Sequence, residues 1–341
     1  MNILVLEHIT AGGMGGEPVP VALADAGMAM WKAVVEDFSA AGHQVRTIAG
    51  ERADVPGQPR CVSITPTVPY AETIERMAKD SQAALIIAPE SGGILASYEE
   101  TLRKWGVRSL GSDPKAIALC GDKFLLGDHW MKAGFSSPMT GTAPTPGVVL
   151  EAVKEKMLVN LTTWIFKPRD GAGCEHNYLA HTLKDLEELE TKLSPETKWV
   201  AQHYFPGMPA SVSFIVHEGK PRPLLAGRQF IQGNDQLRYA GGKLPLDRDL
   251  AERAIALATR AIRTIAGLTG FVGVDLILGA APKDDTVIEV NPRLTFSYCG
   301  LRKLCKTNLA AALLDPAAPI EWNTGSVSFN AAGVATKDGW A

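Results

Sequence analysis

The segment that most constrains this chain is residues 271–293, which read FVGVDLILGAAPKDDTVIEVNPR. Two apolar runs, residues 271–278 and 286–290, flank a polar turn, and this pattern predicts two adjacent strands of a hairpin. Asp275 interrupts the first run. Three polar side chains two positions apart end the second run: Glu289, Asn291 and Arg293. Because alternate residues of a strand project from one face, we expect these side chains to converge.

The expected hairpin places Asp275 across from Glu289 and Asn291. Two carboxylates and an amide oxygen form an all-oxygen ligand set, which suits a hard cation such as Mg²⁺. Arg293 adds a planar cation for a phosphate or a carboxylate. The alternative is a buried strand pair with a structural salt bridge. Polar groups inside apolar strands need a compensating partner, and this requirement favours the metal–phosphate interpretation.

Composition indicates an ordinary globular enzyme. The chain has 341 residues, 46% hydrophobic and 21% charged, which is long enough for about two to three domains. The formal net charge of −3 gives no argument for nucleic acid or for an anionic membrane. The five cysteines lack CxxC spacing, which argues against a zinc ribbon and a disulfide framework.

The N-terminus, MNILVLEHIT, has no basic region and no cleavage site, so it predicts a first strand instead of a signal peptide. No apolar run reaches the roughly 18 residues that a membrane span needs. We therefore expect a soluble, cytoplasmic protein.

The first 110 or so residues alternate strand and helix, which predicts a parallel sheet covered by helices. The glycine-rich loop 12–16 follows the first strand, and we expect loops after strand ends to open onto one ligand-binding edge. The expected elements are strands 2–6, 45–48, 85–89 and 107–110 and helix 22–40.

Residues 111–126, GSDPKAIALCGDKFLL, predict one helix that bridges into the next region. Residues 138–146, rich in Pro, Thr and Gly, are the best candidate for a linker. Further along, the patterns predict strands 164–168, 199–205 and 212–216, a polar loop at 169–173, and helices 183–193 and 250–266. We expect three subdomains with the bounds 1–112, 113–200 and 201–341.

Two lysines precede the hairpin in the sequence, at positions where they could bind a triphosphate. Lys167 leaves an apolar strand just before a loop that contains Gly171 and Gly173, whose backbone N–H groups can fold over an anion. A buried lysine needs a partner, which favours a functional role. Lys123 lies in the bridging helix, where a solvated helix lysine is the alternative. The glycines could also simply form a turn.

In this order, the pieces resemble an ATP-grasp enzyme: a helix lysine, a strand lysine with a glycine loop, a strand running into QHYFPG, then D…E-x-N-x-R. The resemblance extends from residue 2 to about residue 308. At finer grain the chain is similar to the branch of the superfamily that ligates glutamate to tyramine in methanofuran biosynthesis. The matching segments are LIIAPE, SLGSDPKAIALCGDK, QHYFPG, SVSFIV, TGFVGVDLIL and IEVNPR.

The resemblance implies an α/β ATP-grasp fold, with an N-terminal Rossmann-like domain, a lid and a C-terminal catalytic part. It implies ATP with two Mg²⁺ ions, or Mn²⁺ in their place, held by Asp275, Glu289 and Asn291. Lys123 and Lys167 would hold the α- and β-phosphates, and the 169–173 loop would close over the β- and γ-phosphates. Arg293 would steady the transferring phosphoryl group or the acyl phosphate. The residues of the adenine-reading hinge would be Gln202, His203, Tyr204 and Phe205.

Two positions depart from the family pattern. His203 stands where relatives often have an acid, and Met208, Pro209 and Ala210 stand where relatives usually offer an acid to the ribose. Nucleotide affinity or base preference could therefore differ. A packed histidine is the simpler interpretation of His203.

Other polar residues are candidates for the acceptor site. Glu7 and Glu90 follow apolar strands, so each could receive a substrate ammonium or be a solvated loop acid. Further candidates lie between the hinge and the hairpin in the sequence: Arg228, Gly241, Gly242 and Lys243. The RYAGGK sequence is compatible with a mobile loop over the substrate or with a surface turn.

We expect an ATP-dependent carboxylate–amine ligase that works through an acyl phosphate and releases ADP. The expected substrates are small molecules: glutamate as donor and tyramine, tyrosine or a related one-carbon cofactor precursor as acceptor. A ligase of D-alanine or polyglutamate type and a nucleotide-binding regulator without turnover are alternatives. We expect no nucleic-acid or membrane partner, and a homodimer stays open.

Overall fold

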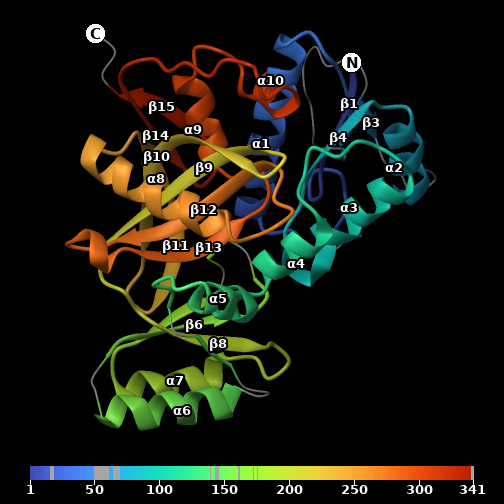
Figure 1. Ribbon diagram of the computed structural model, residues 1–341. Coiled ribbons are helices and arrows are strands. Elements are labelled where there is room, and N and C mark those ends of the chain that lie inside the picture. The colour runs from blue at the N-terminus through green and yellow to red at the C-terminus, as the bar shows by residue number, and fades with distance from the viewer. Residues whose placement is uncertain are drawn as a thin grey trace.

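The computed structural model describes residues 1–15, 19–49, 61–63, 70–138, 140–142, 146–159, 162–171, 173–174 and 176–338. An N-terminal α/β unit lies beside a large sheet, and a smaller lobe carries α6 (Pro146–Val159) and α7 (Leu183–Lys192) (Figure 1). Gly16 of the expected glycine loop lies outside the described residues, as do Met139 and residues 143–145 of the expected linker.

The N-terminal unit is a sheet of four parallel strands in the order β3, β2, β1, β4. This arrangement confirms the parallel sheet predicted from the alternating pattern. The strands are β1 (Asn2–Glu7), β2 (Gln44–Ala49), β3 (Cys61–Ser63) and β4 (Ala83–Ile87).

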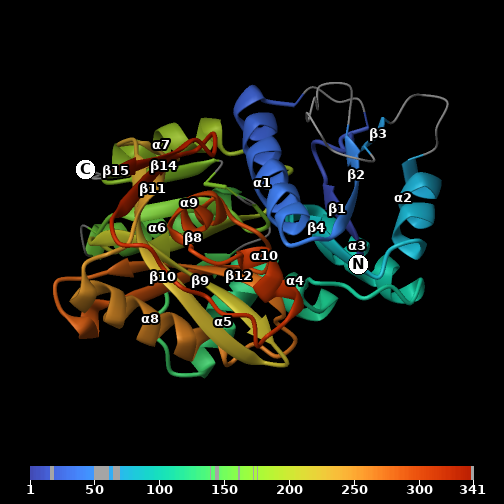
Figure 2. The ribbon, with the colours of Figure 1, turned by 90° about the horizontal axis from the view of Figure 1, so that it is seen from above.

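Helices cover both faces of this sheet because its side chains alternate between two apolar clusters. Ile3 and Val5 of β1 pack in the cluster that contains α1 (Val21–Ala40), whereas Leu4 and Leu6 pack in the opposite cluster. That second cluster contains residues of α2 (Tyr70–Lys79) and α3 (Ile94–Lys104). Figure 2 shows α1 and α2 on opposite sides of the strands.

Two predictions about the end of this unit are wrong. Residues 107–110 form no strand; Ser109 makes only an isolated parallel bridge to Ala84 beside β4. The expected single helix at 111–126 is two helices, α4 (Pro114–Gly121) and α5 (Lys123–Lys132). The break falls at Asp122, whose backbone is extended and whose side chain caps the second helix.

The rest of the chain builds a large sheet with the strand order β13-β12-β9-β10-β11-β7-β6-β8-β5; β14 also pairs with β11, and β15 pairs with β14. Its pairings are antiparallel. The first strands are β5 (Thr140–Thr142), β6 (Trp164–Pro168), β7 (Asn177–Ala180), β8 (Trp199–His203) and β9 (Met208–His217). The others are β10 (Lys220–Gln232), β11 (Gln236–Leu244), β12 (Gly270–Leu278), β13 (Thr286–Asn291), β14 (Ser326–Asn330) and β15 (Ala335–Asp338).

This architecture confirms the predicted α/β class: a parallel N-terminal sheet is followed by a large antiparallel one. The RYAGGK sequence is neither a mobile loop nor a surface turn. It lies in β11, which pairs with β10 on one side and with β14 on the other. The subdomain bounds at residues 112 and 200 stay predictions.

Helices of the C-terminal part complete the core. One face of the β9–β12 region packs against α8 (Arg248–Ile262), which confirms the predicted amphipathic helix. The helices α9 (Ser297–Leu304) and α10 (Leu309–Leu314) share an apolar cluster with α1. The N-terminal unit and the C-terminal part are therefore joined by a common core.

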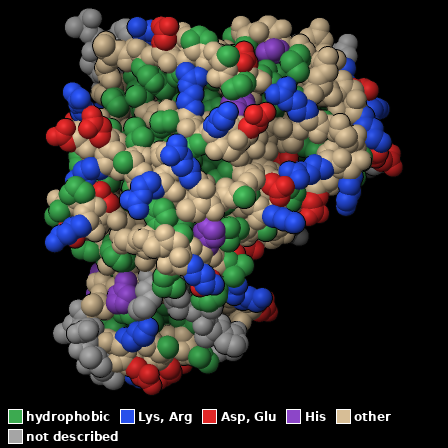
Figure 3. Space-filling view, viewed as in Figure 1, with side chains coloured by type: hydrophobic (Ala, Val, Ile, Leu, Met, Phe, Trp, Pro, Cys, Tyr) green, Lys and Arg blue, Asp and Glu red, His purple; other side chains and the backbone are tan. Residues whose placement is uncertain are grey.

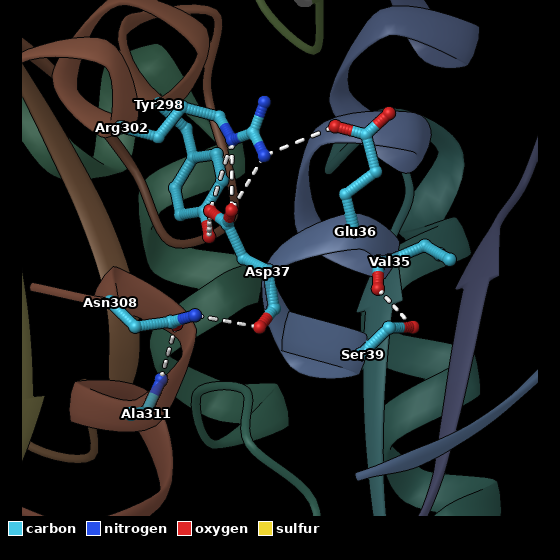
Figure 4. Close-up of polar contacts among 8 residues, drawn as sticks. All are labelled: Val35, Glu36, Asp37, Ser39, Tyr298, Arg302, Asn308 and Ala311. Carbon is cyan, nitrogen blue, oxygen red and sulfur yellow. Dashed lines mark hydrogen bonds and ion pairs between the residues drawn. The ribbon is translucent and has the colours of Figure 1, made fainter. Parts of the chain in front are cut away.

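A polar network crosses the same junction (Figure 4). Asp37 of α1 accepts hydrogen bonds from Arg302 Nε at 3.0 and 3.1 Å and from the hydroxyl of Tyr298 at 2.7 Å. Asn308 Nδ2 donates to the Asp37 backbone carbonyl at 2.7 Å, and Glu36 lies 3.1 Å from Arg302. Removing Arg302 would leave the partly buried Asp37 carboxylate without its charged partner, so the pair helps to hold the two parts together.

The surface carries charges of both signs, and on the face seen in Figure 3 they are interspersed. The molecule narrows above the lobe of α6 and α7 in this view. Among the helices that the structure describes, none combines the length and the apolar character needed to cross a membrane.

Glu99 of α3 is a fully buried acid outside the site described below. Burial raises its pKa to about 7 from 4.5, against the opposing effects of Ser109 and Arg103. The folded state therefore keeps a proton that the unfolded state loses, and stability falls as pH rises from 4.5 to about 7. We expect Glu99→Gln, which mimics the protonated acid, to gain up to about 3 kcal/mol over the wild type at alkaline pH.

Urea unfolding at about pH 5 and about pH 8 checks this expectation. The wild type should lose more stability between the two values than Glu99→Gln does. Glu75→Gln, on the exposed face of α2, should keep the wild-type dependence. Equal pH dependences of wild type and Glu99→Gln would show that Glu99 stays ionised in the folded protein.

Candidate active site

The hairpin of β12 and β13 forms as predicted, with Asp275 directly opposite Glu289. Along β12, Val272, Val274 and Leu276 are buried in the core beneath α8. The intervening Gly273 and Asp275 therefore face the other side, where they line a cavity of about 410 Å³. The pattern that predicted the hairpin thus also determines which face carries the chemistry.

A β-bulge adjusts the second strand of the hairpin. Asp275 pairs with Glu289 but Leu276 pairs with Val287, so Ile288 is the extra residue. Ile288, Glu289 and Asn291 all line the cavity. The bulge thus presents an apolar side chain next to the acidic one.

The polar groups of the hairpin contact one another. Asp275 accepts hydrogen bonds from Gln229 Nε2 at 2.8 Å and from Asn291 Nδ2 at 3.1 Å. Burial and the charge of Glu289 raise the pKa of Asp275 well above its ordinary value. Burial alone would raise the pKa of Glu289 as well, but Lys123 and Lys167 hold it below its ordinary value. Two adjacent acids in one cavity favour a cation between them.

The hairpin suits Mg²⁺ by the chemistry of its donors, since both carboxylates and the Asn291 amide oxygen are hard ligands. In the described part of the chain, no cluster of three or more His, Cys, Asp or Glu side chains could hold a metal ion. A cation at the hairpin would therefore need phosphate oxygens or water to complete its coordination.

Lys167 lies at the cavity, in β6, and only 7% of its surface is exposed. Burial lowers its pKa, and the charge of Glu289 acts in the opposite direction. Lys123 is the first residue of α5, not an interior helix residue as expected. Its ammonium group donates to the carbonyl of Gly171, in the loop after β6. The structure therefore brings both lysines close to the acidic hairpin.

Arg293 is held by three groups. Its Nε lies 3.0 Å from the Glu90 carboxylate, its Nη1 is 3.2 Å from the Leu294 carbonyl, and its Nη2 is 3.4 Å from Asn291 Oδ1. The side chains of Arg293 and Glu90 are 12% and 7% exposed. Such a charge pair is strong and orienting because little water screens it.

The residues of the predicted hinge also lie at the cavity. Gln202, His203, Tyr204 and Phe205 all line it, together with Ile165 and Ile277. The His203 ring packs on Trp164 with 4.0 Å between ring centroids, and burial lowers its pKa. His203 is therefore a packed histidine. Apolar side chains beside the backbone at the end of a strand are suited to binding a planar base.

Comparison with protein families shows the family of this chain. Residues 120–297 match the model of an ATP-grasp domain, and residues 44–117 match that of a pre ATP-grasp 3 domain. The chain belongs to the ATP-grasp family. The enzymes of this ADP-forming ligase family use ATP and Mg²⁺, which agrees with the lysines and hard ligands gathered here.

Relatives are distant in sequence. The chain is 28% identical over 219 residues to the tyramine–L-glutamate ligase of Methanocaldococcus fervens, covering 64% of this chain and 61% of that protein. It thus spans about three-fifths of the length of this relative. An ATP-grasp superfamily protein of Archaeoglobus fulgidus has a similar structure, with a TM-score of 0.72 and 21% identity over 97% of this chain and 92% of that one. The ADP complex of N5-carboxyaminoimidazole synthetase from Staphylococcus aureus gives a TM-score of 0.69 and 15% identity, over 96% and 81%. At these identities the structures establish the fold alone.

Several residues predicted to bind the acceptor lie outside the walls of this cavity. Arg228 lies in β10 with its guanidinium over the Phe230 ring, 5.7 Å from the ring centroid. Glu7 is buried, and its carboxylate accepts the backbone N–H groups of Ile9 at 3.2 Å and Thr10 at 2.6 Å. None of the acceptor candidates lines the cavity: Glu7, Glu90, Arg228, Gly241, Gly242 and Lys243. Glu90 instead pairs with Arg293, because the loop after β4 runs beside the hairpin.

The Met208-Pro209-Ala210 segment also has a structural explanation. It begins β9 and pairs with residues 276–278 of β12, and Pro209 lines the cavity. An apolar wall thus takes the place of the acid that the family pattern leads us to expect.

Several cavity residues escaped the sequence analysis. They are Cys174, Ser211, Ser213, Gln229, Tyr239, Thr295, Phe296 and Ser297. The hydroxyl groups of Ser213, Thr295 and Ser297 are linked, with 2.7 Å between neighbours. The rings of Tyr239 and Phe296 stack at 5.7 Å. The alternation of polar and apolar residues at 211–214 could have indicated that β9 presents serines to the cavity.

A second missed feature is the pairing of Asp122 with Arg169. Arg169 Nε lies 2.9 Å from both carboxylate oxygens of Asp122, and Nη2 lies 2.7 Å from Oδ2. Burial alone would raise the pKa of Asp122, but the hydrogen bond and charge of Arg169 hold it below its usual value. An N-cap signal between Gly121 and Lys123 could have revealed the helix start.

Proposed function

We propose that this protein is an ATP-dependent ligase that joins a carboxylate to an amine through an acyl phosphate and releases ADP and phosphate. The observation that carries the proposal is a cavity whose walls include residues 202–205, Lys167 and the Asp275–Glu289 pair. A nucleotide laid along it would place its base at the hinge and its phosphates at the hairpin.

Each group has a defined part in this proposal. Lys123 and Lys167 hold the α- and β-phosphates, with the loop containing Gly171 and Gly173 over the β- and γ-phosphates. Asp275, Glu289 and Asn291 would hold two Mg²⁺ ions, which when bound neutralise the charge of the transferring phosphoryl group. Backbone groups of residues 202–205 read the edge of the base.

The chain's own residues then position the acid. Arg293, fixed by Glu90, presents its guanidinium beside Asn291 and the metal carboxylates. From there it orients an oxygen of the donor carboxylate toward the γ-phosphate and stabilises the acyl phosphate. Phosphoryl transfer depends mainly on positioning and charge neutralisation, so no nucleophilic side chain is needed.

We propose glutamate as the acid and tyramine, tyrosine or a related precursor of a methanofuran-like cofactor as the amine. Support comes from the tyramine–L-glutamate ligase to which the chain is similar. The stacked Tyr239 and Phe296 rings and the linked hydroxyls of Ser213, Thr295 and Ser297 would suit an aromatic amine.

Product analysis tests the proposal. Purified protein with ATP, Mg²⁺, glutamate and a pool of amines should release ADP and form one new amide, identified by mass spectrometry. ADP release with D-alanine or with glutamate alone would indicate another ligase of the family. Nucleotide binding with no ADP release from any acid and amine would contradict the ligase proposal.

A further inference from the structure

The carboxylate of Asp122 makes contacts to two different segments. Within α5 it accepts hydrogen bonds from the backbone N–H groups of Phe124 and Leu125, both at 3.0 Å. Across the site it pairs with Arg169 through both of its oxygens. The guanidinium of Arg169 also lies over the Phe124 ring, 5.1 Å from its centroid. One carboxylate therefore starts a helix and fixes the first residue of the glycine loop.

The segments that Asp122 connects are those that carry the two phosphate-binding lysines. Lys123 follows Asp122 directly, and its backbone N–H donates to the Arg169 carbonyl at 3.0 Å. Lys167 lies two residues before Arg169 in the chain. The Lys123 ammonium group reaches the carbonyl of Gly171 in the same loop. The relative position of the two lysines is thus set by contacts around Asp122 and Arg169.

We propose that Asp122 and Arg169 are a positioning pair for the nucleotide: they hold Lys123, Lys167 and the glycine loop in their binding arrangement before the phosphates arrive. The inference rests on the proposed nucleotide site. Neither residue needs to touch ATP. Segments that are already held in their bound arrangement lose less conformational freedom when the ligand binds, and this lowers the cost of binding.

A helix cap alone is the competing explanation, and the chain allows the two to be separated. Asn caps a helix about as well as Asp but carries no charge, so Asp122→Asn keeps the cap and weakens the ion pair. Arg169→Gln removes the ion pair from the other side and leaves Asp122 in place. If the pair positions the lysines, both changes should have the same effect.

The chain also provides a matched control. Asp113, the N-cap of α4, accepts the backbone N–H of Lys115 at 2.8 Å and pairs with Arg103 Nη1 at 2.8 Å, and neither Asp113 nor Arg103 lines the cavity. Asp113→Asn weakens a second Arg–Asp pair at a helix cap, one that belongs neither to the hairpin nor to the glycine loop. It should affect unfolding without affecting nucleotide binding.

Calorimetric titration of the full chain with ADP and Mg²⁺ tests the proposal, with the unfolding midpoint of each variant measured in parallel. We expect Asp122→Asn and Arg169→Gln each to raise the Kd for ADP about tenfold, since small displacements of positioned groups are costly. The double variant should be no weaker than the worse single one, because both disrupt the same interaction. In the single variants the KM for ATP should rise together with the Kd for ADP, whereas the KM for the acceptor should not rise.

Three results would contradict the proposed positioning role: a normal Kd in both single variants, a raised Kd in only one of them, or an equal rise in Asp113→Asn. The last would mean that general loosening of the fold weakens the nucleotide site. A wild-type protein that does not bind ADP would instead overturn the proposed nucleotide site, so the two failures are distinguishable.

Discussion

Glu289→Gln should fold normally and lose turnover by about a hundredfold to a thousandfold or more, the usual loss for one positioned electrostatic group. The substitution keeps the size of the side chain and its place opposite Asp275 in the hairpin. It removes the carboxylate on which the charges of Lys123 and Lys167 act. A neutral amide is also a much poorer ligand for Mg²⁺. Initial rates of ADP release at saturating ATP measure the effect.

The control is the same substitution at Glu252, an exposed residue of α8 whose partner is Arg248. It should leave both the rate and the fold unchanged. Circular dichroism and unfolding midpoints establish that the Glu289→Gln protein is folded. A folded variant with a near-normal rate would return Glu289 to the role of a structural acid.

Lys167→Met should weaken the binding of ADP–Mg²⁺ by about ten- to a hundredfold, the range expected when a largely desolvated charge–charge contact is removed. Lys167 is buried in the cavity wall, so little water screens the attraction between its ammonium group and a bound phosphate. Methionine fills a similar volume without a charge, which keeps β6 packed. Calorimetric titration gives the affinity, and steady-state kinetics should show an unchanged KM for the amine.

Lys184→Met provides the comparison, because Lys184 lies exposed on α7 in the same lobe. It should bind nucleotide like the wild type. Equal affinities of wild type and Lys167→Met would mean that the buried lysine only balances the acids of the hairpin. A raised KM for the amine alone would move Lys167 to the acceptor site.

The hairpin could be predicted from sequence because everything that defines it is local. A short polar turn sets the partners, and the alternation of Val272, Val274 and Leu276 with polar or small residues sets the faces. The strand of Lys167 was predictable for the same reason. Only the bulge at Ile288 changes the pattern, and it leaves Glu289 opposite Asp275.

Contacts between distant segments could not be predicted in this way. Glu90 and Arg293 are separated by 203 residues, and no local pattern brings a loop of the first sheet to the hairpin. The glycine at position 241 predicted a turn, but the close approach of another strand explains why this position is a glycine. A Cβ there would lie 2.0 Å from the Phe329 carbonyl oxygen of β14. Its φ of +128° also favours glycine within a paired strand.

The most direct test of the central claim follows the oxygen of the donor carboxylate. If an acyl phosphate forms, one oxygen of ¹⁸O-labelled glutamate must leave with inorganic phosphate while ADP accumulates. Mass spectrometry of phosphate and nucleotides after amide formation measures both. The proposed mechanism predicts label in phosphate, in proportion to the amide formed. Label in AMP, or amide without transfer of label, would contradict it.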